Sequence, residues 1–378
     1  MKQNLEIKMK KGYYVHFQGR SSVGISKKID MQLEEFSEHY NIGEIEVRTL
    51  QRSLLQRIIG LFPTASISRD YTKALEDLDN PDFIYVRRAV ADRKYVKFWR
   101  NIKEKYPECK IIIEIFTYPY DKDSFGTWDA WPFYIKELIY RRNLKKYIDR
   151  FVTYSKHTEI FGVPTICTTN GVDVKKISIV KGEYRDNKLT MIGVAYMQRH
   201  HGYERIIEGM HRYYQEKKRN YDVELLLVGE GPEKPKYYNM VQKYQLQNHV
   251  KFYENTFGKQ LDEMYDTSDI ALASFGMYKL GIYDSLVALK TRECLAKGMP
   301  LITGCKVDIL DDNFKYVKNF PNNGQAIEIE EIIKFHEKLK KEDSDKETVA
   351  KNIRDFAVQH VDMKSVMEPI IEYINSES

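Results

Sequence analysis

The chain has 378 residues, of which 42% are hydrophobic and 30% are charged, and its net charge is +5. This length predicts two domains of roughly 150–200 residues each, and the composition excludes a disordered or low-complexity protein. No run of about 18 apolar residues is present, so we expect no membrane-spanning helix. The basic N-terminus lacks the apolar run of a secretory signal, and the four cysteines have neither zinc nor redox spacing. These features favour a cytoplasmic protein.

The charge is distributed unevenly between the two halves. Residues 1–183 contain 32 Lys and Arg against 24 Asp and Glu, a net charge of +8, and the remainder carries −3. Two interpretations stay open: the first half meets an anionic partner such as a membrane surface, or its charges are ordinary solvated surface. No nucleic-acid-binding motif accompanies the charge, so we do not expect nucleic acid as a partner.

Strand-like and helix-like segments alternate along the first half. The apolar runs typical of strands are 11–19, 43–50, 81–89, 110–117, 150–155 and 165–171. Amphipathic stretches such as 25–40 and 97–108 lie between them and indicate helices.

The same alternation continues in the second half. The strand-like runs are 188–195, 223–229, 249–256, 270–275 and 300–304, and the helical stretches are 202–219, 236–247, 259–268, 287–298 and 328–341. Such alternation predicts βαβ units and parallel sheets. We therefore predict an α/β fold with two doubly wound, Rossmann-like domains, 1–183 and 184–360, and a final helix, 361–375, that returns to the first domain. Ligands bind such sheets beyond the carboxyl ends of the strands.

The first candidate binding segment begins at Gly193, where a strand ends and the basic run MQRHHGYER follows. A strand–Gly–helix turn presents backbone N–H groups and a helix N-terminus to an anion, most often a phosphate. The backbone at Gly202 would add N–H dipoles, and Arg199, His201 and Arg205 would add cationic or donor side chains. The alternative is a basic first turn that faces water. No Cys or acidic cluster accompanies the histidines, so we expect no metal.

Two further segments of the second half could contact a nucleotide. The turn VGEGPE contains Glu230 between glycines that permit tight geometry. Lys290 and Glu293 lie three residues apart on one predicted helix and therefore face the same way. Near a nucleotide, the carboxylate could accept the ribose hydroxyls and the lysine could meet the diphosphate. The alternatives are a plain connection at Glu230 and a surface Lys–Glu pair.

The first half offers loops for a ligand rather than a known nucleotide motif. The loop 19–28 contains Gly24 among small residues, which would let the backbone approach the ligand, but it does not match a Walker loop. No G-x-G-x-x-G follows any strand, which disfavours a dinucleotide oxidoreductase. After the strand 110–117, Tyr118, Tyr120 and Asp121 lie at the expected cleft edge. The D-x-D triplets there and at 77–79 favour solvated loop carboxylates over a metal site.

The segment 128–150 carries aromatic residues early and five Lys and Arg residues late. One interpretation is an amphipathic helix that rests on an anionic bilayer surface. The other is an ordinary helix with favourable cations at its C-terminus.

Together these segments resemble the family-4-type retaining glycosyltransferases of the GT-B fold, over most of the chain and most densely from 188 to 304. MIGVAYMQRHHGYERI is similar to the family segment that binds the donor diphosphate, and VGEGPE looks like its V-G-x-G-P strand end. TTNGVDVKKI is similar to the N-G-V-D segment that closes the family's first domain.

The resemblance also assigns expected roles. TRECLAKGMPLI resembles the run that carries the second of two family glutamates, so Glu293 is expected to hold the nucleotide ribose. The first glutamate falls on Ser285, with Asp284 beside it, which leaves the catalytic residue open. Its candidates are Asp284, Ser285, Tyr118 and Asp121. His201 stands where the family has a lysine, and Arg199 or Lys290 would compensate.

The resemblance implies a GT-B enzyme with two domains that face each other across a cleft. It would move a sugar, with retention, from a nucleotide-sugar donor to a glycan or polyprenyl-linked saccharide, without a cofactor or a metal. HGYER with ALKTREC is similar to a subgroup of bacterial exopolysaccharide and capsule assembly. A lipid-linked acceptor would bring the basic first domain to the inner membrane face. The alternatives are a non-catalytic GT-B protein that binds sugar or a partner enzyme, and a GT-B epimerase; the short chain disfavours a phosphorylase.

Overall fold

The computed structural model describes residues 9–17, 23–50, 53–62, 64–121, 130–216, 219–281, 288–311, 313–343 and 345–377. The chain forms two compact units, Met1–Thr169 with Met363–Ser378 and Asn170–Asp362. The division therefore falls earlier than the expected boundary at 183. The reason is that the backbone N–H of Val172 donates to Val361 O at 2.9 Å and its side chain is buried in the core of the second unit.

The first unit is built on a sheet of seven strands in the order β2-β1-β3-β4-β5-β7-β6, in which only β6 runs antiparallel to its neighbour. Its elements are β1 (Lys11–His16), α1 (Val23–His39), β2 (Asn41–Glu46), α2 (Leu54–Ile59), α3 (Tyr71–Glu76), β3 (Phe83–Arg87), α4 (Arg93–Lys105), β4 (Lys110–Ile115), α6 (Trp131–Tyr140), the 3₁₀ helix η2 (Arg141–Lys146), β5 (Arg150–Thr153), β6 (Glu159–Ile160), β7 (Val163–Cys167) and α13 (Met363–Asn375).

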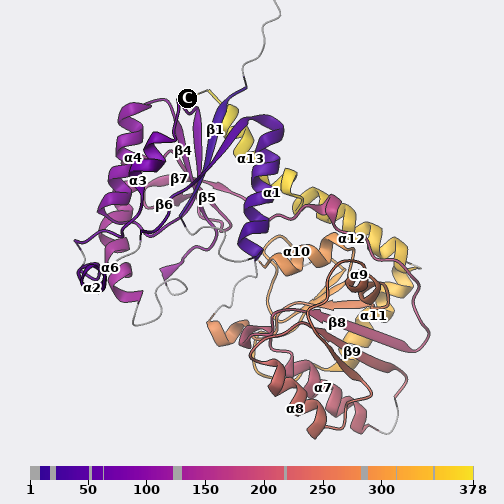
Figure 1. Cartoon of the computed structure of the whole chain (residues 1–378). Coiled ribbons are helices and arrows are strands. Elements are labelled where there is room, and N and C mark those ends of the chain that lie inside the picture. The colour runs from indigo at the N-terminus through magenta and orange to yellow at the C-terminus, as the bar shows by residue number, and fades with distance from the viewer. Residues whose placement is uncertain are drawn as a thin grey trace, which may run out of the picture. The chain divides into compact units, whose positions relative to one another are not determined.

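Helices cover both faces of this sheet, because its central strands are apolar on both sides. Tyr14 of β1 packs in a cluster with α1 and α13, whereas Val15, its neighbour in the chain, packs in a cluster with Trp99 of α4. Figure 1 shows α4 on one side of the sheet and α1 with α13 on the other. The helix α13 therefore completes one layer of the first unit.

The second unit is built on an all-parallel sheet of six strands in the order β10-β9-β8-β11-β12-β13. Its elements are η3 (Val174–Lys176), β8 (Lys188–Val194), η4 (Arg199–His201), α7 (Glu204–Gln215), β9 (Asp222–Val228), α8 (Lys234–Lys243), β10 (Val250–Tyr253), α9 (Gly258–Asp266), β11 (Ile270–Leu272), η5 (Met277–Leu280), α10 (Leu289–Ala296), β12 (Leu301–Thr303), β13 (Val317–Asn319), α11 (Ile329–Asp343) and α12 (Lys346–His360).

The order of these six strands is that of a Rossmann sheet, 3-2-1-4-5-6 when counted along the unit. The predicted doubly wound α/β fold is thus confirmed, and each of the eleven predicted strands overlaps a strand of the structure. The strands β6 and β13 and the helices α2, α3 and α12 were not among the predicted elements. No helix in the described part of the chain is both long and apolar enough to cross a membrane.

Candidate donor site at the sheet switch point

The switch point of the second sheet lies between β8 and β11. The chain moves from β8 outward through β9 to β10, then returns to β11 on the other side of β8. The connections that leave β8 and β11 therefore diverge, and a crevice opens at the carboxyl ends of these two strands. The segments that follow them are 195–203 and 273–281.

These two segments are joined by backbone hydrogen bonds. The N–H of Phe275 donates to His201 O at 2.8 Å, and the N–H of Gly276 donates to His200 O at 3.0 Å. Gly202 has a positive φ of 64°, and a Cβ there would lie 2.6 Å from the backbone N of Gly276. Only glycine fits this position, so the sequence places a glycine where two loops touch.

The side chain of Lys290, on α10, contacts both of these segments. Its Nζ donates to the hydroxyl of Tyr203 at 2.9 Å and to Ala273 O at 3.0 Å, and it lies 5.2 Å from the centroid of the Tyr203 ring. Burial lowers the pKa of Lys290 to about 8. Among the described residues, no carboxylate lies within 4.0 Å of its ammonium group. Within the described part of the chain, the hydrogen-bond partners of Lys290 are thus neutral oxygens.

Two histidines share the electrostatic environment of Lys290. Burial, with the charge of Lys290 next, lowers the pKa of His200, and the same two causes lower that of His201 to about 2. The backbone N–H of Gln198 donates to Nδ1 of His201 at 2.9 Å, so the ring proton of His201 is on Nε2. His201 is therefore a neutral N–H donor beside a cation, an arrangement suited to an anionic ligand.

Two other predicted donor-site residues, Arg205 and Gly193, are in close contact with other residues of the second unit. Arg205 is buried, and its guanidinium group donates to the carbonyls of Gln325, Phe275 and Pro321 at 2.6–2.9 Å and to Asn323. Arg205 therefore cross-links loops of the second unit, and its contact with phosphate stays a prediction. Gly193 lies within β8 rather than at its end, and a Cβ there would lie 3.0 Å from the ring of Tyr203.

The glycines of VGEGPE lie against the backbone of another segment. Gly231 has a positive φ of 139°, and a Cβ there would lie 2.4 Å from the backbone N of Met197. Glu230 accepts the Met197 N–H with its backbone carbonyl and pairs with Lys234 through its side chain. This turn therefore supports the segment after β8, which holds the two histidines.

The remaining predicted donor-site residues differ in exposure. Arg199 is exposed at the start of η4, and Glu293 is half-buried on α10, one turn after Lys290. Asp284 and Ser285 lie outside the described residues. Gly24 is the second residue of α1, and a Cβ there would meet nothing within 4 Å, so nothing in the described structure requires glycine at this position.

The predicted acceptor-side residues also differ in burial and in their polar contacts. Tyr120 is buried, donates to Glu137 at 2.6 Å and lies under Arg88, which corrects its expected position at a cleft edge. Asp121 is paired with Arg141 at 2.6 Å. Tyr118 is half-buried against the rings of Tyr120, His157 and Phe161, and its hydroxyl makes no hydrogen bond to any described residue.

A buried polar cluster at the carboxyl edge of the first sheet was not predicted as a unit. Glu114 of β4 lies 3.2 Å from Nζ of Lys28 and 3.7 Å from Nη1 of Arg87, and Tyr154 donates to it. Burial raises the pKa of Glu114, but the charges of Lys28 and Arg87 outweigh burial and hold this pKa below its usual value. Charged residues at the ends of the apolar strands 83–87 and 110–115 are the sequence signal for this cluster.

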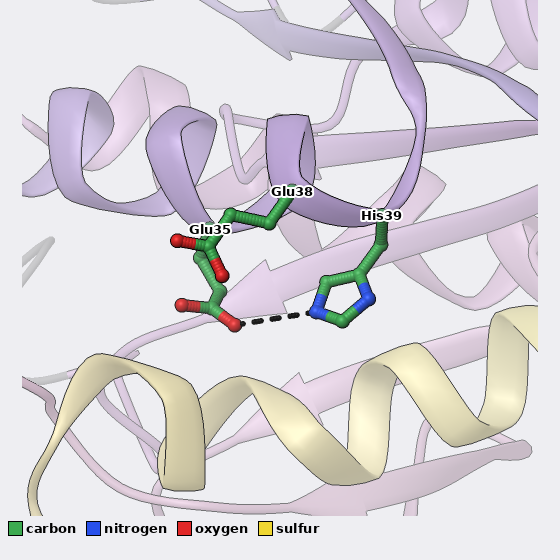
Figure 2. Close-up of side chains that lie close together, drawn as sticks. All are labelled: Glu35, Glu38 and His39. Carbon is green, nitrogen blue, oxygen red and sulfur yellow. Dashed lines mark ion pairs between the residues drawn. The ribbon is translucent and has the colours of Figure 1, made fainter.

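Two other features lie apart from the switch-point crevice. A cavity of about 950 Å³ is lined by Arg205, by Lys318 and by the carboxylates of Glu204, Glu208, Glu328 and Glu331 among others, but not by Lys290 or the histidines. Figure 2 shows Glu35, Glu38 and His39 together on α1, where His39 pairs with Glu35 at 3.5 Å. Two of these three side chains are exposed, and nothing else in the described structure points to a metal there.

Comparisons with known proteins define the class. Residues 174–354 match the family model for glycosyl transferases group 1. This range covers most of the second unit, including the segments after β8 and β11 and the helix α10. No curated protein sequence matches the chain.

Solved structures resemble the whole chain. A glycosyltransferase from Rickettsia africae ESF-5 is 14% identical, with 98% of this chain and 100% of that chain covered and a TM-score of 0.59. The sucrose-phosphate synthase from Thermosynechococcus elongatus is 12% identical, with 96% and 98% covered and a TM-score of 0.60. A lipopolysaccharide outer core galactosyltransferase is 12% identical, with 96% and 99% covered and a TM-score of 0.56. The fold is GT-B, as predicted, and the chain is a glycosyltransferase enzyme.

Proposed function

We propose that the enzyme transfers a sugar, with retention, from a nucleotide-sugar donor to a glycan or polyprenyl-linked saccharide in bacterial polysaccharide synthesis. The observation that carries the donor half of this proposal is the ammonium group of Lys290 at the switch point, with no carboxylate within 4.0 Å among the described residues. This half-buried cation has no counter-ion among the described residues, and the diphosphate of a nucleotide sugar would supply one.

The chemistry explains why such a site is needed. Breaking the sugar–phosphate bond develops negative charge on the leaving diphosphate, and preorganised donors in a water-poor site stabilise that charge. Here Lys290 would provide the charge, His201 a neutral Nε2–H, and Arg199 a second cation at the entrance. Glu293 would hold the ribose. Protein groups would then do the work of a metal, so the proposal includes none.

Solved relatives support the finer points by analogy. A structure of the Staphylococcus aureus transferase TarM, which is 11% identical with a TM-score of 0.51, contains UDP. A trehalose-6-phosphate synthase, 12% identical with a TM-score of 0.56, is described as transferring with retention. The acceptor would lie on the first unit, where the Tyr118 hydroxyl makes no hydrogen bond to any described residue.

The test is thermal stabilisation by UDP, GDP, dTDP, ADP and CMP. A ligand present at a hundred times its dissociation constant should add about 2.7 kcal/mol to the stability of the folded protein. We expect one nucleotide to stabilise the wild type and Glu293→Ala to lose most of that shift. Acceptor-dependent nucleotide release from the matching nucleotide sugar would then establish transfer. No shift with any of the five nucleotides would contradict the donor site.

A further inference from the structure

The helix α2 turns its apolar face to solvent. Leu54, Leu55, Ile58 and Ile59 are spaced so that they share one side of the helix. All four are more than half exposed, from 51% to 77%, and Leu61 and Phe62 in the turn that follows are 49% and 61% exposed. A helix of a globular domain normally buries such a face in the core. In α2 the pattern is inverted.

The helix α6 is inverted as well. Its charged residues Lys136 and Glu137 are almost fully buried, whereas Trp131, Leu138 and Ile139 are 42–51% exposed. Burying a charge is unfavourable unless it is paired or hydrogen-bonded. Glu137 is satisfied by Arg88 at 3.1 Å and by the hydroxyl of Tyr120 at 2.6 Å.

The buried Lys136 joins the two helices. Its Nζ donates to Gly60 O at 2.8 Å and Phe62 O at 2.7 Å, which fixes the turn after α2 against α6. Figure 1 accordingly shows α2 beside α6. We call the result the α2–α6 surface, and its exposed apolar side chains are Leu54, Leu55, Ile58, Ile59, Leu61, Phe62, Trp131, Leu138 and Ile139.

Cations rather than carboxylates accompany this surface. The segment 50–62 contains no Asp or Glu. The 3₁₀ helix η2 follows α6 directly and exposes Arg142, Lys145 and Lys146. Within the described part of the chain, none of these three lies within 4.0 Å of a carboxylate. Trp131 and Tyr134 pack edge to face at 5.9 Å, an amphipathic pair at the start of α6.

We propose that the α2–α6 surface docks the first unit on an anionic lipid bilayer. An apolar face with a Trp–Tyr pair, followed directly in the chain by exposed cations, has the composition of a membrane interface. The leucines and isoleucines would enter the acyl boundary, Trp131 would lie at the headgroups, and η2 would meet lipid phosphates. The proposal extends the lipid-linked acceptor of the proposed function, because docking would bring the acceptor unit to its substrate.

The experiment is co-sedimentation of the full chain with vesicles of phosphatidylcholine alone and of phosphatidylcholine with phosphatidylglycerol. We expect binding to the anionic vesicles, and its loss in the double variant Leu55→Glu/Ile58→Glu. Arg142→Gln/Lys145→Gln/Lys146→Gln should weaken binding by about fivefold per cation removed. Phe257→Glu in the second unit is the matched control, since Phe257 is 78% exposed and far in sequence from the surface. It should bind as the wild type does.

Three results would overturn the proposal. Wild-type protein could fail to bind anionic vesicles, Phe257→Glu could lose binding equally, or Leu55→Glu/Ile58→Glu could instead dissolve an oligomer seen by gel filtration. All the substituted side chains are exposed, so the variants should keep the melting temperature of the wild type, which checks that they fold. The assay contains no nucleotide, so failure here leaves the donor-site proposal standing, and failure of nucleotide binding leaves this one standing.

Discussion

Both units place cations at the carboxyl ends of parallel strands, but the groups around those cations differ. In the first unit Lys28 and Arg87 surround the buried carboxylate of Glu114. In the second unit Lys290 is surrounded by a hydroxyl, a carbonyl and two histidines of lowered pKa. The same fold thus carries one cluster built around a buried carboxylate and one cluster with no carboxylate paired to its cation among the described residues. The cluster around Lys290 is the one that we propose binds the diphosphate.

The Glu114 cluster gives the largest expected effect on stability. Glu114→Gln leaves two buried cations without the carboxylate between them, so we expect a loss of about 3–5 kcal/mol in the free energy of unfolding. Urea denaturation measures this loss. The control is Asp79→Asn at the exposed Lys11–Asp79 pair, which should keep the stability of the wild type because solvent screens an exposed pair. A small effect of Glu114→Gln would contradict the contrast between the two clusters.

The junction between the loops of the second unit gives the next effect. Gly202→Ala places a Cβ against backbone at a positive φ, so we expect a loss of about 1–3 kcal/mol in the free energy of unfolding, with weakened nucleotide binding. Gly24→Ala is the control, because a Cβ there meets nothing within 4 Å. It should keep the stability and nucleotide affinity of the wild type. Loss of nucleotide affinity in Gly24→Ala would show instead that the start of α1 contacts the donor.

The pH dependence of nucleotide binding sharpens the comparison further. Because burial lowers the pKa of Lys290 to about 8, the free protein loses this charge as the pH rises through that value. A bound diphosphate would raise the same pKa, so affinity should be constant below about pH 8 and fall by up to tenfold per pH unit above it. His201 should add no dependence near neutral pH, because its pKa is about 2. Calorimetric titration across this range checks the slope; a flat profile would exclude Lys290 as the titrating group.

The alternation of strands and helices was enough to predict two doubly wound units, because parallel sheets buried on both faces leave long apolar runs in the sequence. The sequence also indicated the segment after β8 and the pair Lys290 and Glu293 as candidates for the donor site. It could not assign partners to these groups. The guanidinium group of Arg205 donates to backbone carbonyls of distant segments, and the backbone of another segment fills the space beside Gly231. Only the tertiary fold brings these partners together.

The inverted helices show a second limit of sequence patterns. The segments 54–62 and 131–140 are apolar enough to belong to a core, and periodicity indicates which residues share a face but not whether that face points inward. The buried ion pair of Glu137 and the hydrogen bonds of Lys136 decide the orientation. Both residues would ordinarily be assigned to solvent.

The central claim is that the ammonium group of Lys290 binds the diphosphate of the donor. Calorimetric titration of Lys290→Met with the most stabilising nucleotide tests this claim most directly. Lys297→Met is the matched control, because Lys297 is on the same stretch of chain and already pairs with Asp262. We predict that Lys290→Met lowers nucleotide affinity by roughly tenfold to a hundredfold, the value of a charge-assisted hydrogen bond, while Lys297→Met binds as the wild type does. Equal affinity in Lys290→Met and the wild type would contradict the account.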